Sequence, residues 1–286
     1  MRVHVQAAGI CGSDLEMVRL GPLPVTLGHE FAGALDDGTP VAVRPSVPCG
    51  ACDRCTARQP QQCRAALARA YGISADGGMA ESVVVDASCI TPIELPVTDA
   101  ALVEPTAVAL HALNRAGVCA GMNVGVVGAG TIGLLCAAVG RSLGCTVTIA
   151  ARHDAQRRAA EALGVTVGLG RSHDVVVEAA GTATGFDDAV RACARGGIVA
   201  LVSTTWEPVT VSFMAAQMRE VTIVPAFLYG EAGGEPEFTT AARLLAAHPE
   251  WPGVLVTHRF PLAAAAEAFR VAGDRAHGAI KVVLEP

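Results

Sequence analysis

Lysine is almost absent from this sequence, because Lys281 is the only lysine among its 21 basic residues. We attribute that imbalance to the composition of the genome and not to function. The chain also lacks a block of basic residues, and its formal net charge is −6, so no electrostatic footprint for binding nucleic acid is present. Charged residues make up only 17% and apolar residues 51%, a balance that excludes intrinsic disorder.

A long apolar run is missing as well. The first residues, Met1–Gln6, alternate like a strand and lack the continuous apolar stretch of a signal peptide. The run Val124–Leu135 holds four glycines and is too short to span a membrane. We therefore expect a cytoplasmic protein without a membrane partner, whose ten cysteines are free or metal-bound rather than paired in disulfides.

The 286 residues suit one large or two ordinary domains, and the sequence has two parts of different character. The first hundred are rich in Gly and Pro and contain short β-like stretches, which indicates a β-rich domain. From about Pro105, apolar strands alternate with Ala-rich helices, which predicts an α/β domain with a parallel sheet covered on both faces. Its expected strands are Asn123–Val127, Thr146–Ala150, Val175–Glu178, Ile198–Val202 and Val221–Pro225; its expected helices are Thr131–Leu143, Ala155–Leu163 and Gly185–Ala194.

Four cysteines lie close together in a polar loop: Cys49, Cys52, Cys55 and Cys63. Four thiolates at this spacing can surround one tetrahedral zinc ion, with no coordination position left open, so we expect a structural site. The same spacing also suits an iron–sulfur cluster, and a group of cysteines without metal is the third alternative.

A glycine-rich turn follows the expected strand Asn123–Val127 and opens the next helix. Its sequence, Gly128-Ala129-Gly130-Thr131-Ile132-Gly133, matches the dinucleotide fingerprint in the structural context that the fingerprint requires. Gly128 permits the tight turn, Gly130 lets the backbone approach a pyrophosphate, and Gly133 allows close packing of helix on strand. The amino terminus of the helix, with Thr131 and Ile132, then faces the phosphate charge.

The choice between NAD and NADP depends on the end of the second expected strand, Thr146–Ala150. A carboxylate there would bind the ribose 2′-hydroxyl, but the strand is followed by Ala151-Arg152-His153, and Asp154 is better placed to cap the next helix. Arg152 can pair with a 2′-phosphate, helped by Arg157 or His153. We therefore expect NADP(H), with a solvated Arg152 as the alternative.

A second set of metal ligands is scattered over the first hundred residues. Cys11 and His29 can supply sulfur and nitrogen, and Glu30 or Glu104 can supply oxygen. A catalytic zinc ion needs about three protein ligands and one open position. Each of these residues taken alone also fits an ordinary structural role.

Taken together, the motifs resemble the zinc-dependent medium-chain dehydrogenase/reductase superfamily, and more narrowly its sorbitol, threonine and polyol dehydrogenase branch. The resemblance spans nearly the whole chain. It rests on Cys11–Asp14, Gly28–Glu30, the four-cysteine loop, Gly77–Glu81, Glu104-Pro105, the glycine fingerprint and the tail Gly278–Val282.

The resemblance implies a GroES-like catalytic domain over residues 1–104, completed by 257–286, and a Rossmann domain over 105–256. It implies a catalytic zinc ion held by Cys11, His29 and a glutamate, with Glu30 and Glu104 exchanging the roles of ligand and neighbour. Ser13 matches the hydroxyl that relays the proton. Glu16 stands where the family usually has a histidine, so we expect either that it accepts the proton or that the relay bypasses it.

Several segments are shorter than the family pattern. The chain starts inside what is usually the second or third strand of the catalytic domain, and the stretch Gly33–Val43 is brief. Only ten residues separate Leu163 from Asp174, so we expect a short or irregular third Rossmann strand without its following helix.

The resemblance implies a zinc-dependent oxidoreductase that interconverts a polyol, sugar-like or secondary alcohol and its carbonyl with NADP(H). Its ions would be one catalytic and one structural zinc, its substrate a small molecule, and its assembly a homodimer or homotetramer joined along Val221–Tyr229. An inactive zinc- and NADP-binding paralogue or redox sensor is the first alternative. A zinc-free reductase of quinones or enoyl groups is the second.

Overall fold

The computed structural model describes residues 1–286, except for the side chain of Arg275. The chain divides into two compact units: Met1–Ala107 with Tyr229–Pro286 (unit 1), and Val108–Leu228 (unit 2). The sequence places residues 229–256 with the Rossmann domain, whereas the structure groups them with unit 1. This segment packs closely on unit 1, since a Cβ at Gly230 would run into Gln61 of the four-cysteine loop.

Unit 1 is built around a seven-stranded, mostly antiparallel sheet in the order β14-β15-β1-β2-β3-β5, with β4 also paired to β1. Valine, isoleucine and alanine alternate inward along β1 and meet Phe31, Val41, Val43 and Leu284 in one core. The strands are β1 Arg2–Ile10, β2 Glu30–Ala34, β3 Pro40–Val43, β4 Ser82–Val84, β5 Ile90–Pro92, β14 Val256–Pro261 and β15 Lys281–Glu285, with a separate hairpin of β12 Glu231–Ala232 and β13 Glu235–Pro236.

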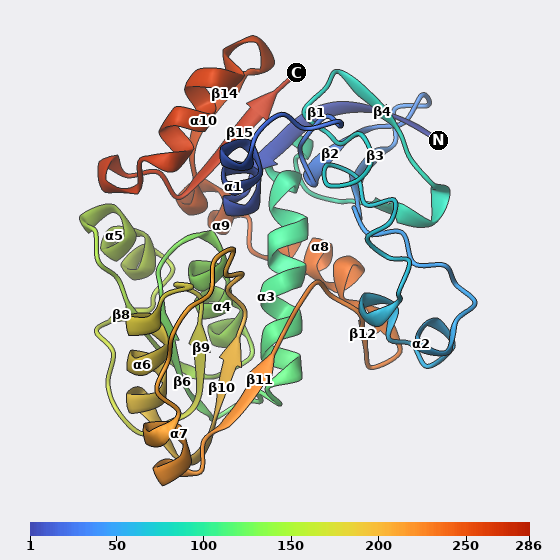
Figure 1. Cartoon of the computed structure of the whole chain (residues 1–286). Coiled ribbons are helices and arrows are strands. Elements are labelled where there is room, and N and C mark those ends of the chain that lie inside the picture. Colours follow the sequence, from blue (N-terminus) through green and yellow to red (C-terminus); the bar gives the residue numbers. More distant parts are fainter. The chain divides into compact units, whose positions relative to one another are not determined.

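Short helices connect these strands. The α-helices are α1 Gly12–Leu20, α2 Asp53–Thr56, α8 Glu237–Ala247, α9 Glu250–Leu255 and α10 Ala265–Gly273; the 3₁₀ helices are η1 Pro60–Gln62, η2 Ala87–Cys89, η3 Val97–Leu102, η4 Leu262–Ala264 and η5 Arg275–His277. Helix α3, Val103–Arg115, begins in unit 1 and ends in unit 2. The C-terminal β14, α10 and β15 therefore return to the sheet that contains the first strand of the chain (Figure 1).

Unit 2 is a six-stranded parallel sheet in the order β11-β10-β9-β6-β7-β8. This order is that of a Rossmann domain, as predicted. The strands are β6 Asn123–Val127, β7 Thr146–Ala150, β8 Thr166–Val167, β9 His173–Glu178, β10 Cys193–Leu201 and β11 Thr222–Pro225; the helices are α4 Thr131–Ser142, α5 Asp154–Ala162, α6 Ala183–Ala192 and α7 Met214–Arg219.

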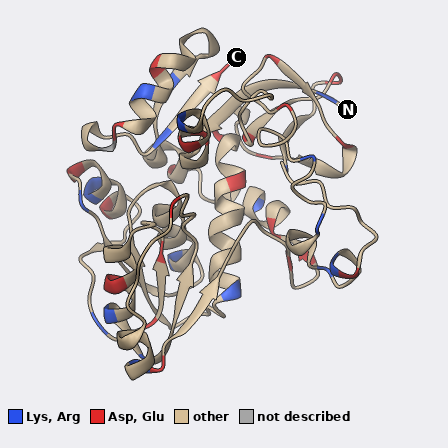
Figure 2. Cartoon of the chain, in the orientation of Figure 1, with Lys and Arg blue, Asp and Glu red and all other residues tan. Residues whose placement is uncertain are grey.

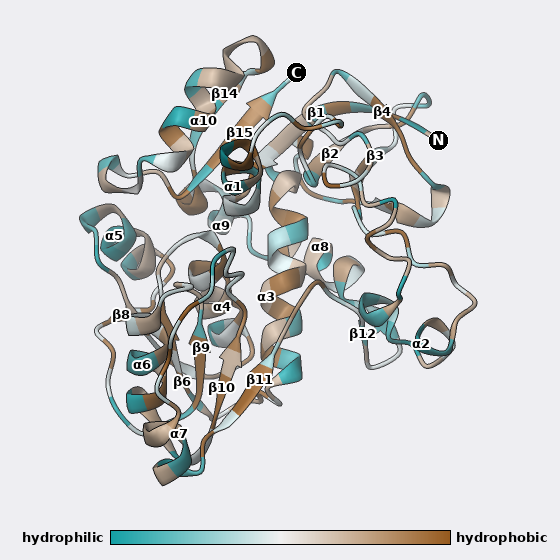
Figure 3. Cartoon of the chain, in the orientation of Figure 1, coloured by the Kyte–Doolittle hydropathy of each residue, from teal (hydrophilic) through white to brown (hydrophobic). Residues whose placement is uncertain are grey.

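The third strand of this sheet is reduced. Strand β8 has two residues, and among the described elements no helix separates it from β9, which confirms the expectation drawn from the short Leu163–Asp174 interval. The long apolar strands agree closely with the predicted ones because continuous β-branched runs pack on both faces of a parallel sheet. Figure 3 shows the contrast in unit 2 between hydrophobic β11 and hydrophilic α5.

Charged residues of both signs are interspersed over the two units (Figure 2). Within the described residues, no helix has the length and apolar character needed to cross a membrane.

Candidate active site

A thiol, an imidazole and a carboxylate converge where β1 ends and β2 begins. Cys11 follows the last residue of β1, His29 precedes β2, and Glu30 is the first residue of β2. The possible ligand atoms of these three side chains all lie within 4.8 Å of one another. Since zinc in proteins prefers sulfur, imidazole nitrogen and carboxylate oxygen, this group could hold a zinc ion and leave a position open.

The pairing of β1 with β2 creates this cluster. Gly9 lies opposite Glu30 in the antiparallel register, and a Cβ at Gly9 would overlap the Glu30 carboxylate. The close approach of the two strands at Gly9 is therefore a requirement of the cluster.

His29 is held on both sides of its ring. Its Nδ1 lies 3.3 Å from Oδ1 of the fully buried Asp14, and its Nε2 lies 3.4 Å from Ser13 Oγ. Asp14 Oδ2 also accepts a hydrogen bond of 2.8 Å from the Cys11 N–H, while the Asp14 Oδ1–His29 Nδ1 contact falls short of hydrogen-bond geometry. Burial alone would lower the pKa of His29, but Cys11 and Asp14 together raise it well above the ordinary value.

Glu104 stands beside this cluster, on the first turn of α3. It is 7% exposed and lies outside the group of mutually close ligand atoms. Burial is the main cause that raises the pKa of Glu104 to about 7, with His29 opposing the shift and Glu30 adding to it. Burial and the neighbouring Glu104 also raise the pKa of Tyr229, whose buried hydroxyl makes no hydrogen bond of standard geometry within the described residues.

Lys281 is a site residue that sequence reasoning did not find. Its ammonium donates to Glu30 Oε2 and, at 3.1 Å, to the backbone oxygen of Ile10. The side chain is 2% exposed, and the attraction of Glu30 raises the pKa of Lys281 against the effect of burial. Two features of the sequence could have pointed to it: Lys281 is the only lysine of the chain, and it lies in the tail motif Gly278–Val282.

The two residues expected to relay a proton occupy different surroundings. Ser13 is within reach of the His29 ring, in the first turn of α1. Glu16 accepts a hydrogen bond of 2.7 Å from Arg19 Nε on the outer side of the same helix. The structure thus brings Ser13 to the cluster, while the Glu16 carboxylate is engaged by Arg19.

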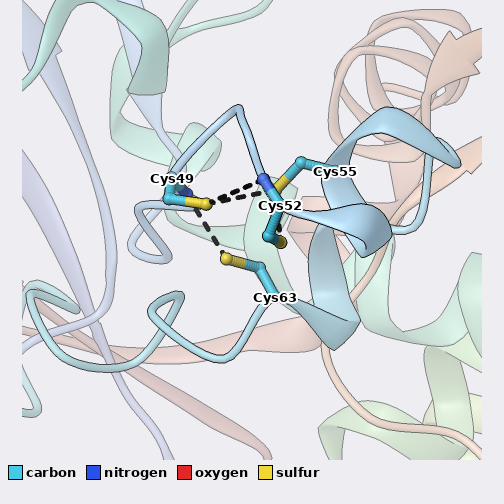
Figure 4. Close-up of side chains that lie close together, drawn as sticks. All are labelled: Cys49, Cys52, Cys55 and Cys63. Carbon is cyan, nitrogen blue, oxygen red and sulfur yellow. Dashed lines mark hydrogen bonds between the residues drawn. The ribbon is translucent and has the colours of Figure 1, made fainter.

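The four cysteines of the polar loop converge as expected (Figure 4). The Sγ atoms of Cys52 and Cys55 are 3.6 Å apart, and those of Cys49 and Cys55 are 3.9 Å apart. Sulfurs at about 2.3 Å from a tetrahedral zinc would be roughly 3.8 Å from each other, so the arrangement fits the ion. Hydrogen bonds from the backbone of Ala51 and Cys52 lower the pKa of Cys49 to about 6, which favours the thiolate that a metal requires, whereas burial raises the pKa of Cys55 to about 12.

In unit 2, the glycine turn has the form of a phosphate cradle. Gly128 has φ +100°, which favours glycine, and a Cβ at Gly133 would overlap the Gly128 oxygen. Nothing in the described residues lies within 4 Å of the place that a Gly130 Cβ would occupy. The turn therefore leaves space at the amino terminus of α4, where Thr131 and Ile132 begin the helix.

At the end of β7, the two candidate arginines differ. The Arg157 guanidinium donates to Asp154 Oδ1 at 2.6 Å and to the backbone oxygens of Ala151 and Arg152. Arg152 is exposed. His153, not Asp154, is the N-cap of α5, and Asp154 pairs with Arg157 from the first helical position. Arg152 thus remains the better candidate for contact with a 2′-phosphate.

Two family models together match almost the whole chain. Residues 1–95 match the alcohol dehydrogenase GroES-like domain, and residues 98–285 match the glucose dehydrogenase C-terminus. The chain belongs to the zinc-dependent medium-chain dehydrogenase/reductase family. It is accordingly an oxidoreductase of the alcohol dehydrogenase type that depends on a nicotinamide cofactor, in agreement with the prediction from sequence.

Individual relatives support the same assignment. Galactitol 1-phosphate 5-dehydrogenase of Escherichia coli is 30% identical, with 100% of this chain and 92% of the relative covered. The crystal structure of that E. coli enzyme superimposes with a TM-score of 0.88 at 30% identity, over 100% of this chain and 92% of the other. The sequence alignment runs over 324 positions although this chain has 286 residues, so the relative contains segments that this chain lacks.

Two solved structures with similar sequence identity to this chain contain cofactors. A protein from Sinorhizobium meliloti, described as a zinc-binding dehydrogenase and bound to NADP, is 29% identical with a TM-score of 0.84, over 100% and 92% of the two chains. A short chain alcohol dehydrogenase from E. coli complexed with NADH is 27% identical with a TM-score of 0.88, over 100% and 91%. Relatives thus occur with either dinucleotide.

Proposed function

We propose that this enzyme uses one catalytic zinc ion and NADP(H) to interconvert a polyol, sugar-like or secondary alcohol and its carbonyl, and that a second zinc ion stabilises the four-cysteine loop. The observation that carries the proposal is the cluster formed by the partly buried Cys11 with the buried His29 and Glu30, with ligand atoms within 4.8 Å of one another. The polyol class is supported by the resemblance to galactitol 1-phosphate 5-dehydrogenase.

Each residue of the cluster has a role that follows from its contacts. Cys11, His29 and Glu30 would hold zinc, with Glu104 as the exchangeable oxygen ligand beside them. Zinc bound there supplies Lewis acidity, which lowers the pKa of an alcohol. Asp14 lies 3.3 Å behind the ring of His29, where a carboxylate commonly orients a metal-binding histidine, and Lys281 compensates the charge of Glu30.

Ser13 is positioned to take the substrate proton. Its hydroxyl is 3.4 Å from His29 Nε2, so a substrate oxygen at the cluster would be within reach of it. The onward path through Glu16 is a separate prediction, because Arg19 engages that carboxylate. A pH–rate profile of Glu16→Gln that coincides with the wild type would exclude Glu16 from the relay.

The residues of unit 2 bind and orient the dinucleotide. Gly128, Gly130 and Gly133 shape the turn, Thr131 and Ile132 offer the first amides of α4, and Arg152 provides the charge for a 2′-phosphate. A bound nicotinamide supplies the hydride acceptor or donor. Arg157 supports the same end of β7 through the backbone oxygens of Ala151 and Arg152.

We further propose a homodimer or homotetramer. Strand β11 forms the outer edge of the parallel sheet, next to the exposed Phe227. An edge strand presents unpaired backbone groups that a second copy can pair with. Light scattering of the wild type against a Thr222→Pro variant tests this edge.

Zinc content decides the central proposal. We expect about two zinc ions per chain in the wild type and one in both Cys11→Ser and Cys63→Ser, since each substitution removes a ligand from a different cluster. Cys119→Ser, at an exposed cysteine outside both clusters, is the control and should keep both ions. Activity with polyols and ketoses should vanish in Cys11→Ser and should persist, at least before the loop unfolds, in Cys63→Ser. A Cys11→Ser variant that retains both ions and full activity would contradict the proposal.

A further inference from the structure

The last residue of β9, Glu178, joins two loops at the carboxyl edge of the parallel sheet. Its side chain is 1% exposed. Oε1 accepts hydrogen bonds from the N–H groups of Ala180 and Gly181, both at 2.9 Å, and Oε2 accepts one from the Ser203 hydroxyl. The backbone oxygen of Glu178 accepts two more, from Val202 N at 3.1 Å and Ser203 N at 3.2 Å. One residue thereby fixes the loop after β9 to the loop after β10.

Glu178 lies at the point where the order in which the chain adds strands to the sheet reverses. From β6 the chain proceeds outward to β7 and β8, whereas from β9 it proceeds the opposite way, to β10 and β11. Ligands of open parallel sheets bind in the crevice outside the strand ends at such a point. Glu178 therefore ends one of the two strands that flank the expected crevice.

The loop that Glu178 holds is also in contact with the glycine turn. A Cβ on Gly128 would lie 2.9 Å from the backbone carbonyl of Ala179 and 2.9 Å from the nitrogen of Ala180. The Ala179 N–H donates to the oxygen of Val127, at 2.8 Å. One wall beside the glycine turn is thus the segment Ala179–Gly181, and the Glu178 carboxylate accepts hydrogen bonds from the backbone N–H groups of Ala180 and Gly181 in that segment.

The topology also says which half of a dinucleotide this wall would face. With the pyrophosphate at the amino terminus of α4, the end of β7 with Arg152 is available to the adenosine half. The other half must extend in the opposite direction, over the ends of β9 and β10. Those are the two ends that Glu178 ties together.

A buried carboxylate at this position needs hydrogen-bond donors around it. Burying one is unfavourable unless hydrogen bonds replace its water, and the partners named above are neutral N–H and O–H donors. Hydrogen bonds to an ionised acceptor are about twice as strong as neutral ones, so the carboxylate holds both loops more firmly than an amide could.

We propose that Glu178 is a positioning residue for the nicotinamide half of the dinucleotide, acting through the loops Ala179–Thr182 and Val202–Thr204. This inference rests on the proposed function. It assigns Glu178 no contact with the reacting atoms. Its effect is on how the two loops are placed where the nicotinamide half would bind.

Two variants and a matched control test the inference. Glu178→Gln keeps the size of the side chain but turns one acceptor into a donor. Ser203→Ala removes the partner at the other end and leaves the carboxylate in place. Glu161→Gln makes the same chemical change at an exposed position on α5. The ligands are the reduced dinucleotide that the wild type prefers and the matching fragment without nicotinamide, ADP-ribose or its 2′-phosphate.

We expect both test variants to bind the whole dinucleotide about tenfold more weakly, because each loses a hydrogen bond to a charged group. Binding of the fragment should stay within about twofold of the wild type, since the adenosine side is untouched. The fluorescence of the bound nicotinamide should shift toward that of the free form. The double variant should lose little beyond the single ones, because both changes break one connection.

The outcomes separate this inference from the proposal it rests on. Equal weakening of dinucleotide and fragment would show a general structural role and overturn the inference, as would wild-type binding of both in Glu178→Gln and Ser203→Ala. Should Glu178→Gln fail to fold, Ser203→Ala alone decides between the same results. A wild-type protein that binds neither ligand would contradict the proposed function itself.

Discussion

The only lysine of the chain, Lys281, donates from its buried ammonium to the carboxylate of Glu30. Lys281 begins β15, the last strand, which lies antiparallel to β1. Strand β1 in turn pairs with β2, with Gly9 opposite Glu30. Both side chains are at most 2% exposed. The C-terminal strand therefore supplies the positive charge that allows a carboxylate to be buried at the candidate metal site.

Removing that positive charge should destabilise the protein. In protein stripped of metal, Lys281→Met keeps much of the apolar stem but leaves Glu30 buried without its partner. Breaking a buried ion pair costs about 3–5 kcal/mol, so we expect the free energy of unfolding in urea to fall by that amount. Arg270→Met, which removes an exposed pair with Glu267, is the control and should cost about 1 kcal/mol or less.

The double variant Lys281→Met/Glu30→Gln sharpens the test. Because the second substitution removes the uncompensated charge, most of the lost stability should return. A Lys281→Met variant as stable as Arg270→Met would show that the pair does not stabilise unit 1.

Local features of the site could be predicted from sequence because they depend on short spacing. The four cysteines lie within 15 residues and the glycine turn within 6, so their pattern alone indicates the geometry. Strands β6 and β7 begin and end at the predicted residues, since their apolar runs have clear limits. Helix α1 was missed, although Asp14 accepting from the Cys11 N–H is a capping arrangement that the sequence contains.

Contacts made by distant segments could not be read from spacing. Lys281 reaches Glu30 only because β15 joins the sheet beside β1. Tyr229 comes next to Glu104 only because the chain returns to unit 1 at that residue. Neither contact leaves a periodic trace in the sequence, and each joins residues that lie more than 100 positions apart in the chain.

Alanine at two glycines of the turn should separate folding from binding. Gly130 has φ −78° and open space around its missing Cβ, so Gly130→Ala should keep its melting temperature yet bind dinucleotide more than about tenfold more weakly. Gly133→Ala would place a Cβ on the Gly128 oxygen and should lose about 1–3 kcal/mol of stability. Thermal unfolding and fluorescence titration measure the two effects. Unchanged binding in Gly130→Ala would refute the pyrophosphate position.

The preference for NADP(H) should depend on Arg152. Arg152→Ala removes the exposed guanidinium at the end of β7 and should weaken NADPH binding about 10–100-fold, since a charge-assisted contact is lost. NADH binding should change less than about twofold. Arg158→Ala, which removes another exposed arginine on α5, is the control. If NADPH binds Arg152→Ala as tightly as the wild type, another group selects the cofactor, or the enzyme prefers NAD.

Loss of the metal from the four-cysteine loop should unfold that loop and leave the sheet of unit 1 intact. Cys63 is the buried member of the cluster and the one farthest along the chain, so Cys63→Ser removes the residue that closes the loop. Trypsin should then cleave at the exposed Arg54, Arg58 or Arg64, where the wild type resists. Intact Cys119→Ser under the same conditions excludes a general effect of losing a thiol, and mass spectrometry of the fragments identifies the cut. Visible absorption and bound iron in the wild type would instead favour the iron–sulfur alternative. Equal resistance of Cys63→Ser and wild type would mean that the loop does not depend on a metal.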